Sequence, residues 1–310
     1  YFLFKISKEI SNKKIAYLSS TLIISTPLWF NFSHYGGIDM NLVCINLIGI
    51  YNLLKSEKNN FYFMNIFLSG LFFSLGFFIR SYMQLLPILS FLPFLIYKLI
   101  NFNNKKIKFF AFGFGIGLIP LVLNLFYYYQ EFQLEGISIL FKFANDKALS
   151  GNLFTGFLFY PSNLILLTLP TSIFLVNGIL IAKNEYSLDK KLLIIGSPII
   201  SVIMLSITSA RHNHYLITIV PWLCFLAAIG LNDFIERDLK ISRRTTILFS
   251  YTASLLGLLF SIFSFLLLIN YLKIENINSF SRIFIFITSI YYLNISLRLT
   301  QNIYNKKLFV

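Results

Sequence analysis

The chain has 310 residues, of which 57% are hydrophobic, 18% aromatic and only 12% charged, and its formal net charge is +14. Its mean hydropathy of +0.74 excludes a soluble globular domain of this length and predicts a polytopic membrane protein. The basic residues are scattered through short connectors, which argues against a nucleic-acid-binding patch. Both cysteines, Cys44 and Cys224, lie in apolar segments and indicate neither a disulfide framework nor a zinc site.

Apolar segments recur from end to end, each near the length of about 20 residues that a helix needs to cross a membrane. They predict an all-α fold, a polytopic transmembrane helical bundle of about ten spans. Its longest connector, Tyr129 to Tyr160, contains a part, Ile137 to Leu149, that is typical of a helix lying on the membrane interface. The expected spans are about 15–31, 40–54, 61–79, 85–100, 109–128, 161–182 (broken by Pro170), 192–209, 214–231, 246–272 and 283–297.

The positions of Lys and Arg predict the orientation of the chain in the membrane. Under this topology all but six of the 26 lie on the side where the chain begins, so we expect both ends to be cytoplasmic. We expect an integral protein of the bacterial inner (plasma) membrane, with residues 1–310 forming a single membrane domain. The six Lys and Arg residues expected on the outer, periplasmic face are Arg80, Lys142, Lys147, Arg211, Lys273 and Arg282.

Two charged residues lie at span ends on that outer face. Asp39 follows the Gly36–Gly37 pair, so it is either a helix-capping carboxylate or a general base toward an acceptor hydroxyl or amine. Arg80 ends an apolar run, so it either reaches toward the lipid headgroups or holds a lipid phosphate through its guanidinium.

All three histidines, His34, His212 and His214, also fall on the outer face. The stretch from Ser209 to Pro221 contains Arg211-His-Asn-His-Tyr215 and joins two spans. It is either an ordinary interfacial turn or one wall of a site that binds phosphate or sugar. A zinc site is disfavoured, because no third ligand has a diagnostic spacing.

Four stretches, in this order and topology, resemble a known family. They are Ser33-His-Tyr-Gly-Gly-Ile-Asp39, Leu68 to Arg80 followed by Leu85-Leu-Pro87, Phe159-Tyr160 with Leu169-Pro170, and Arg211 to Pro221. The chain is similar to GT-C type glycosyltransferases that use polyprenyl-phosphate sugars, in the superfamily of protein O-mannosyltransferases and aminoarabinose (lipid A) transferases. The resemblance covers residues 15–231. Arg80 stands where the family commonly has Lys, a change that keeps the charge but alters the donor geometry.

The resemblance implies that a sugar moves from a polyprenyl-phosphate carrier to a lipid, glycan or protein acceptor on the outer face. Arg80 and Arg211 would stabilise the departing lipid phosphate. The residues expected to orient the phosphate or the sugar are His34, His212, His214, Tyr215 and Tyr160, and Asp39 is the catalytic candidate. No resident metal or other cofactor is required by this picture, although some members of the fold class use a divalent metal.

One departure from the family concerns the first outer loop, which carries an acidic pair and would lie upstream of residue 15. Glu9 is the only acid in Tyr1 to Lys14. We therefore expect either an N-terminally truncated sequence or a catalytically impaired copy, with residues 1–231 as a glycosyltransferase-like core lacking its first span and loop, and 232–310 as C-terminal spans. Two alternatives stay open: a transporter or flippase of lipid-linked or anionic solutes, and a glycan polymerase or ligase.

Overall fold

The computed structural model describes residues 1–57, 62–102, 104–148, 153–169, 171–207, 212–236, 243–269 and 279–305. Within these ranges the regular structure is helical, with no strand, as the composition predicts. The chain divides into two compact units, Tyr1–Asp233 and Phe234–Val310.

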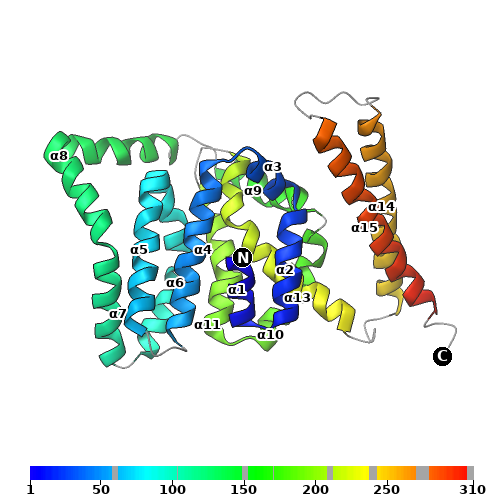
Figure 1. Ribbon diagram of the computed structural model, residues 1–310, viewed down its shortest axis with the longest axis horizontal. Coiled ribbons are helices and arrows are strands. Elements are labelled where there is room, and N and C mark those ends of the chain that lie inside the picture. Colours follow the sequence, from blue (N-terminus) through cyan, green and yellow to red (C-terminus); the bar gives the residue numbers. More distant parts are fainter. Residues whose placement is uncertain are drawn as a thin grey trace. The chain divides into compact units, whose positions relative to one another are not determined.

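The first unit is a bundle of helices and short 3-10 or π-helical segments (Figure 1). It contains α1 (Phe2–Ile10), α2 (Lys13–Ser25), α3 (Pro27–His34), α4 (Ile38–Ser56), α5 (Tyr62–Arg80), η1 (Ser81–Gln84), α6 (Leu85–Asn101), α7 (Asn104–Gly117), α8 (Ile119–Ala148), α9 (Leu153–Leu167), η2 (Thr171–Phe174), α10 (Leu175–Glu185), α11 (Leu188–Lys191), η3 (Leu192–Gly196), α12 (Ser197–Ile207), η4 (Asn213–Thr218) and α13 (Val220–Glu236).

The second unit, described by itself, is a pair of long helices, α14 (Arg243–Leu268) and α15 (Ser279–Asn305), which pack against each other. Two serines join them: the hydroxyl oxygens of Ser264 and Ser289 lie 2.7 Å apart in a buried hydrogen bond. Small hydroxyl residues at such an interface let the backbones approach and hydrogen-bond across it, as in membrane helix pairs.

The predicted all-helical fold is confirmed, but the predicted count of about ten spans is not. The described residues contain three single helices long and apolar enough to cross a membrane, Ile38–Ser56, Tyr62–Arg80 and Leu188–Ile207. The number rises to five if two bent pairs each count as one span. These apolar helices are those of an integral membrane protein.

The breaks between segments explain the difference in count. Proline begins α3 at Pro27, where the preceding helix α2 ends at Ser25, so the expected first span is two short helices. The expected sixth span bends by 106° between Phe159–Leu167 and Thr171–Glu185. The expected eighth span starts later than predicted, because the 3-10 segment η4 precedes α13.

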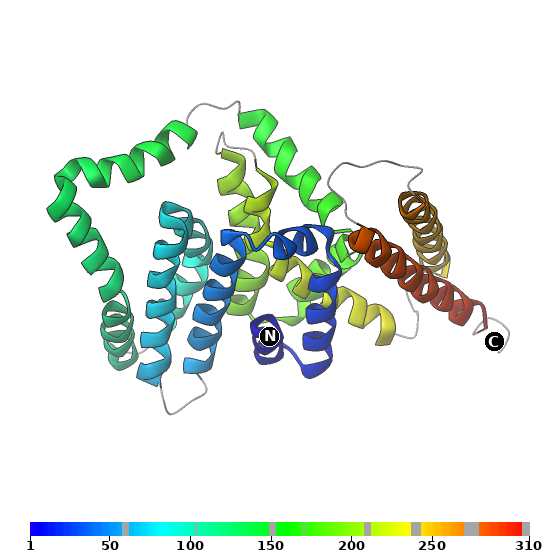
Figure 2. The same ribbon diagram turned by 45° about the horizontal axis from the view of Figure 1, so that its top comes forward.

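The helix α8 turns at Gln133, whose φ of 51° and ψ of −145° are not helical. Its first part packs beside α5, and its second part runs off at an angle, as Figures 1 and 2 both show. The helix expected from Ile137 onward is thus present up to Ala148.

The core of the first unit is built around α13. This helix is apolar on all sides, and its residues from Val220 to Gly230 are all buried, including Cys224. A helix that is hydrophobic all round must be enclosed by other helices to be stable in this way. Cys44, in contrast, lies on the exposed side of α4.

Glycines allow α10 to approach α13 closely. A Cβ atom at Gly178 would overlap the backbone carbonyl of Leu226, and one at Gly230 would overlap the carbonyl of Phe174. The side-chain amide of Asn177 donates to the carbonyl of Gly230 at 3.2 Å, which joins the two backbones at the crossing. Close backbone contact of this kind is how helices associate where burial of apolar surface gives little driving force.

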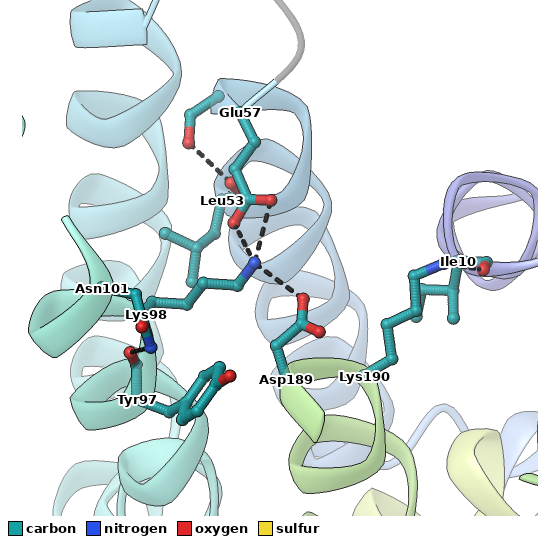
Figure 3. Close-up of polar contacts among 9 residues, drawn as sticks. Ile10, Leu53, Glu57, Tyr97, Lys98, Asn101, Asp189 and Lys190 are labelled. Carbon is teal, nitrogen blue, oxygen red and sulfur yellow. Dashed lines mark hydrogen bonds and ion pairs between the residues drawn. The ribbon is translucent and has the colours of Figure 1, made fainter. Parts of the chain in front are cut away.

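Polar contacts lie at one end of α4 and α6 (Figure 3). The ammonium of Lys98 lies 2.7 Å from Glu57 Oε1 and 2.8 Å from Asp189 Oδ2, joining α6, α4 and α11. Nearby, Lys190 donates to the carbonyl of Ile10 at 2.7 Å and holds the end of α1. Since Asp39 lies in the first turn of α4, this group is separated from Asp39 by the whole helix, about 1.5 Å per residue.

Gly178→Ala tests the close crossing of α10 and α13. The added methyl group meets backbone and not a flexible side chain, so the helices must separate. We expect the melting temperature in detergent to fall by about 3 °C or more. Gly115→Ala is the matched control, because its Cβ would have nothing within 4 Å. Equal melting temperatures for the two variants would contradict the crossing.

Candidate functional site

The site begins with the turn that leads into α4. Gly36 has a φ of +61°, a backbone conformation that favours glycine, and Gly37 is the N-cap of the helix. Asp39 therefore lies in the first turn, where a carboxylate suits the helix dipole. The predicted sharp Gly-Gly turn is confirmed, and it delivers the Asp39 side chain to the end of α5.

Arg80 is the last residue of α5 and contacts two side chains from elsewhere in the fold. Its Nε lies 3.0 Å from Asp39 Oδ1, and the two side chains are 26% and 13% exposed. The N–H of Nε is not aligned for a hydrogen bond, so this contact is an ion pair. Its Nη2 lies 3.3 Å from His214 Nε2. About a quarter of the Arg80 side chain thus remains accessible, although its Nε is buried.

The contact with Arg80 determines the tautomer of His214. A guanidinium has only N–H donors, so the imidazole Nε2 must accept, and the proton of a neutral His214 is then on Nδ1. His214 lies in η4, outside the candidate spans. Burial lowers its pKa; the Asp39 carboxylate opposes this shift, and the charges of Arg80 and His212 add to it. His214 is therefore neutral at neutral pH, as an acceptor from Arg80 must be.

Aromatic rings surround His214. The ring of Phe32, from α3, lies edge-on at 6.1 Å between centroids, and that of Tyr215 at 4.3 Å. The His212 ring stacks on His214 at 5.1 Å. Burial is the main cause that raises the pKa of the Tyr215 phenol; the charge of Arg80 opposes this shift and that of Asp39 adds to it. The phenol therefore stays protonated and able to donate a hydrogen bond.

Tyr160 contacts the backbone of the turn that carries His212, His214 and Tyr215. It is fully buried in α9, and its hydroxyl oxygen accepts a hydrogen bond from the backbone N–H of His212 at 3.4 Å. Such a contact fixes the backbone of the histidine-containing turn. The position of Tyr160 favours a supporting role over direct contact with a substrate.

Two of the predicted site residues are not among the described side chains that surround Arg80 and His214. His34 is exposed at the end of α3, with its ring stacked on Phe30 of its own helix at 6.5 Å and edge-on to Tyr35. Arg211 lies outside the described residues. Among the residues that the structure describes, no three or more His, Cys, Asp or Glu side chains form a group that could hold a metal ion.

Comparison with known proteins identifies the fold. Residues 1–127 match the family described as dolichyl-phosphate-mannose-protein mannosyltransferase. Two solved structures of ArnT from Cupriavidus metallidurans are similar: the form bound to undecaprenyl phosphate (TM-score 0.66) and the apo form (TM-score 0.64), each with 14% sequence identity. Both similarities cover 99% of this chain. The chain has the fold of ArnT.

The resemblance predicted from the sequence is thus confirmed, both by the family match over the first 127 residues and by the fold. The chain spans about half the length of ArnT, 55% and 54% in the two structures. Comparison with curated protein sequences gives no significant match.

Sequence reasoning missed two residues that lie close to the site. Phe32, which packs on His214, carries no distinguishing signal in an aromatic-rich stretch. Gln84, four residues after Arg80, is fully buried and bonds Asn46. Its signal was available: Asn46 follows Asp39 by seven residues, a spacing that places both on one face of a helix.

The buried, neutral His214 predicts a pH dependence of stability. Because its pKa is lower in the folded protein than in the unfolded chain, the unfolded state binds more protons below about pH 6.5. The contribution of His214 is complete above that pH and is lost as the pH falls toward the folded-state pKa. We expect the melting temperature of the wild type to drop more between pH 7 and pH 5 than that of His214→Gln.

His34→Gln is the matched control for this measurement, because the ring that it removes is exposed. It should retain the full wild-type loss at low pH. If His214→Gln loses as much stability as the wild type and His34→Gln between these two pH values, the assignment of His214 as a buried neutral acceptor is wrong.

Proposed function

We propose that the protein transfers a sugar from a polyprenyl monophosphate carrier to an acceptor at the outer face of the membrane. One observation carries the proposal: a partly exposed arginine, held by a carboxylate and a neutral imidazole at a helix end, in the fold of an enzyme whose structure contains undecaprenyl phosphate. The name of the family that residues 1–127 match likewise includes a sugar carried on a polyprenyl-type phosphate, dolichyl-phosphate-mannose.

Arg80 is suited to bind the phosphate of such a carrier. Asp39 and His214 contact Nε and Nη2, so the remaining N–H groups of the guanidinium can point at phosphate oxygens. In the transfer, the bond between the anomeric carbon and the phosphate oxygen breaks, and negative charge grows on the departing phosphate. A fixed cation there stabilises the transition state more than the ground state. Under this proposal Arg80 supplies that charge, without a resident metal.

Asp39 is placed to handle the acceptor. As the new bond forms between the acceptor oxygen or nitrogen and the anomeric carbon, the acceptor proton must leave to a base. The Asp39 carboxylate pairs with Arg80 through Oδ1, and 13% of its side chain is exposed. We assign it to accepting or orienting this proton, either alone or together with a further acid.

The turn from His212 to Tyr215 forms the wall that would face the sugar. His212 is exposed, and Tyr215 retains its phenolic proton, so together they can accept from and donate to sugar hydroxyls. Arg211 adjoins this wall in sequence and stays a predicted second cation for the phosphate. The sidedness of the site follows from the predicted orientation, with Asp39 and Arg80 at one end of α4 and α5 and the Lys98 group at the other.

Asp39→Asn tests this proposal in the full-length protein. The amide keeps the shape of the side chain but can no longer take up a proton, so we expect transfer of labelled sugar from the polyprenyl-phosphate donor to fall by about 100-fold or more. Membrane insertion and detergent-extracted yield should stay unchanged. Glu57→Gln is the matched control, a carboxylate at the opposite end of α4, and should keep most of the activity. Full activity in Asp39→Asn would overturn the assignment.

A further inference from the structure

We propose that Gln84 and Asn46 are positioning residues for Arg80. Gln84, in the 3-10 segment η1, is fully buried and folds its side-chain amide back between α4 and α5. Its Nε2 donates to Asn46 Oδ1 at 2.8 Å, and its Oε1 accepts from Asn46 Nδ2 at 2.9 Å. This inference rests on the proposed function, because it takes Arg80 to be the group that binds the donor phosphate.

The two amides are well satisfied by hydrogen bonds. Gln84 Nε2 also donates to the carbonyl of Phe73 in α5, at 3.1 Å. Asn46 Nδ2 also donates to the carbonyl of Leu42 in α4, at 2.9 Å. Each amide thus joins its partner side chain and a helix backbone. A buried polar pair satisfied in this way specifies one arrangement of the two helices more strictly than an apolar contact does.

Gly76 provides the space for the Gln84 side chain. A Cβ atom at position 76 would overlap the carbon, oxygen and nitrogen of the Gln84 amide. Gly76 precedes Arg80 by four residues and Asn46 follows Asp39 by seven, so each pair lies on one face of its helix. The amide pair and the Arg80–Asp39 ion pair are therefore successive contacts along the same interface between α4 and α5.

The backbone between Arg80 and Gln84 connects the Gln84–Asn46 amide pair to the position of the Arg80–Asp39 ion pair. Ser81, the residue after Arg80, has a φ of +48°, in the left-handed region that residues other than glycine seldom adopt. This conformation ends α5 at Arg80 and turns the chain so that Gln84 can reach back. A strained residue persists only where its surroundings hold it. Here the bonds of Gln84 hold it, and they thereby determine where α5 ends and where the Arg80 side chain begins.

Gln84→Met in the full-length protein tests the proposal. Methionine matches the length of glutamine but cannot make the three hydrogen bonds, and it leaves the Asn46 amide without its partner. We expect backbone hydrogen exchange over residues 76–84 to rise about 10-fold, and kcat/KM for a polyprenyl-phosphate sugar donor to fall about 10-fold with most of the loss in kcat, because Arg80 acts on the charge that grows in the transition state. Asn52→Leu is the matched control: a buried amide on α4 that donates to Ile48 of the same helix. It should leave both quantities unchanged.

Two further variants separate positioning from stability. In an Arg80→Gln background, Gln84→Met should lower kcat no further, because its effect acts through Arg80. The double variant Asn46→Leu with Gln84→Met removes both polar partners, so it should recover the melting temperature lost by Gln84→Met and keep the lowered kcat. Recovery of kcat together with the melting temperature, or full additivity with Arg80→Gln, would overturn the proposal.

The exchange measurement is independent of the proposed function. If the wild type shows no donor-dependent transfer, the proposed function fails, and the exchange rates over residues 76–84 still decide whether Gln84 fixes the turn after Arg80. Unchanged exchange in Gln84→Met would overturn the positioning role, whatever the activity of the protein.

Discussion

The ion pair between Arg80 and Asp39 is the contact on which the arrangement of the site depends. It joins the last residue of α5 to the first turn of α4, two helices that pack along their length. A charge at the end of an apolar helix is costly to remove from water unless it is paired. Arg80 meets this requirement through Asp39 and His214 and still exposes part of its side chain. An arginine restrained on one side and accessible on the other can receive a phosphate without first reorganising.

The rest of the first unit maintains this geometry by packing. The enclosed helix α13 forms the core, and the crossing at Gly178 and Gly230 brings α10 against it. The 3-10 segment η4 leads into α13 and carries His214 and Tyr215, while Tyr160 of α9 holds the backbone at His212. At the opposite end of α4, the ion pairs of Lys98 with Glu57 and Asp189 join α4, α6 and α11 (Figure 3). The site is thus assembled from segments far apart in sequence, each fixed by contacts outside the site.

The sequence predicted the helical fold, the sharp turn before Asp39 and the meeting of Asp39, Arg80 and His214 at one end of the bundle, because charges at the ends of apolar segments report topology. It did not predict the number of spans in the described residues. Breaks near Thr26, Leu118 and Leu167 divide apolar runs that read as single helices, and hydropathy carries no information about bending. His34 stays a predicted site residue; in the structure its side chain is exposed and its ring stacks on Phe30 of its own helix. The Gln84–Asn46 pair was missed because its geometry depends on the left-handed Ser81, a tertiary effect.

Binding of the carrier lipid is the measurement that tests this account most directly. The wild-type protein in detergent should be stabilised against heat by a polyprenyl phosphate and not by the corresponding polyprenol, which lacks the phosphate. Arg80→Gln should lose most of that stabilisation while folding normally, because its amide cannot supply the positive charge. Equal stabilisation by the phosphate and the alcohol, or an unchanged response in Arg80→Gln, would contradict the claim that Arg80 forms a phosphate site at the end of α5.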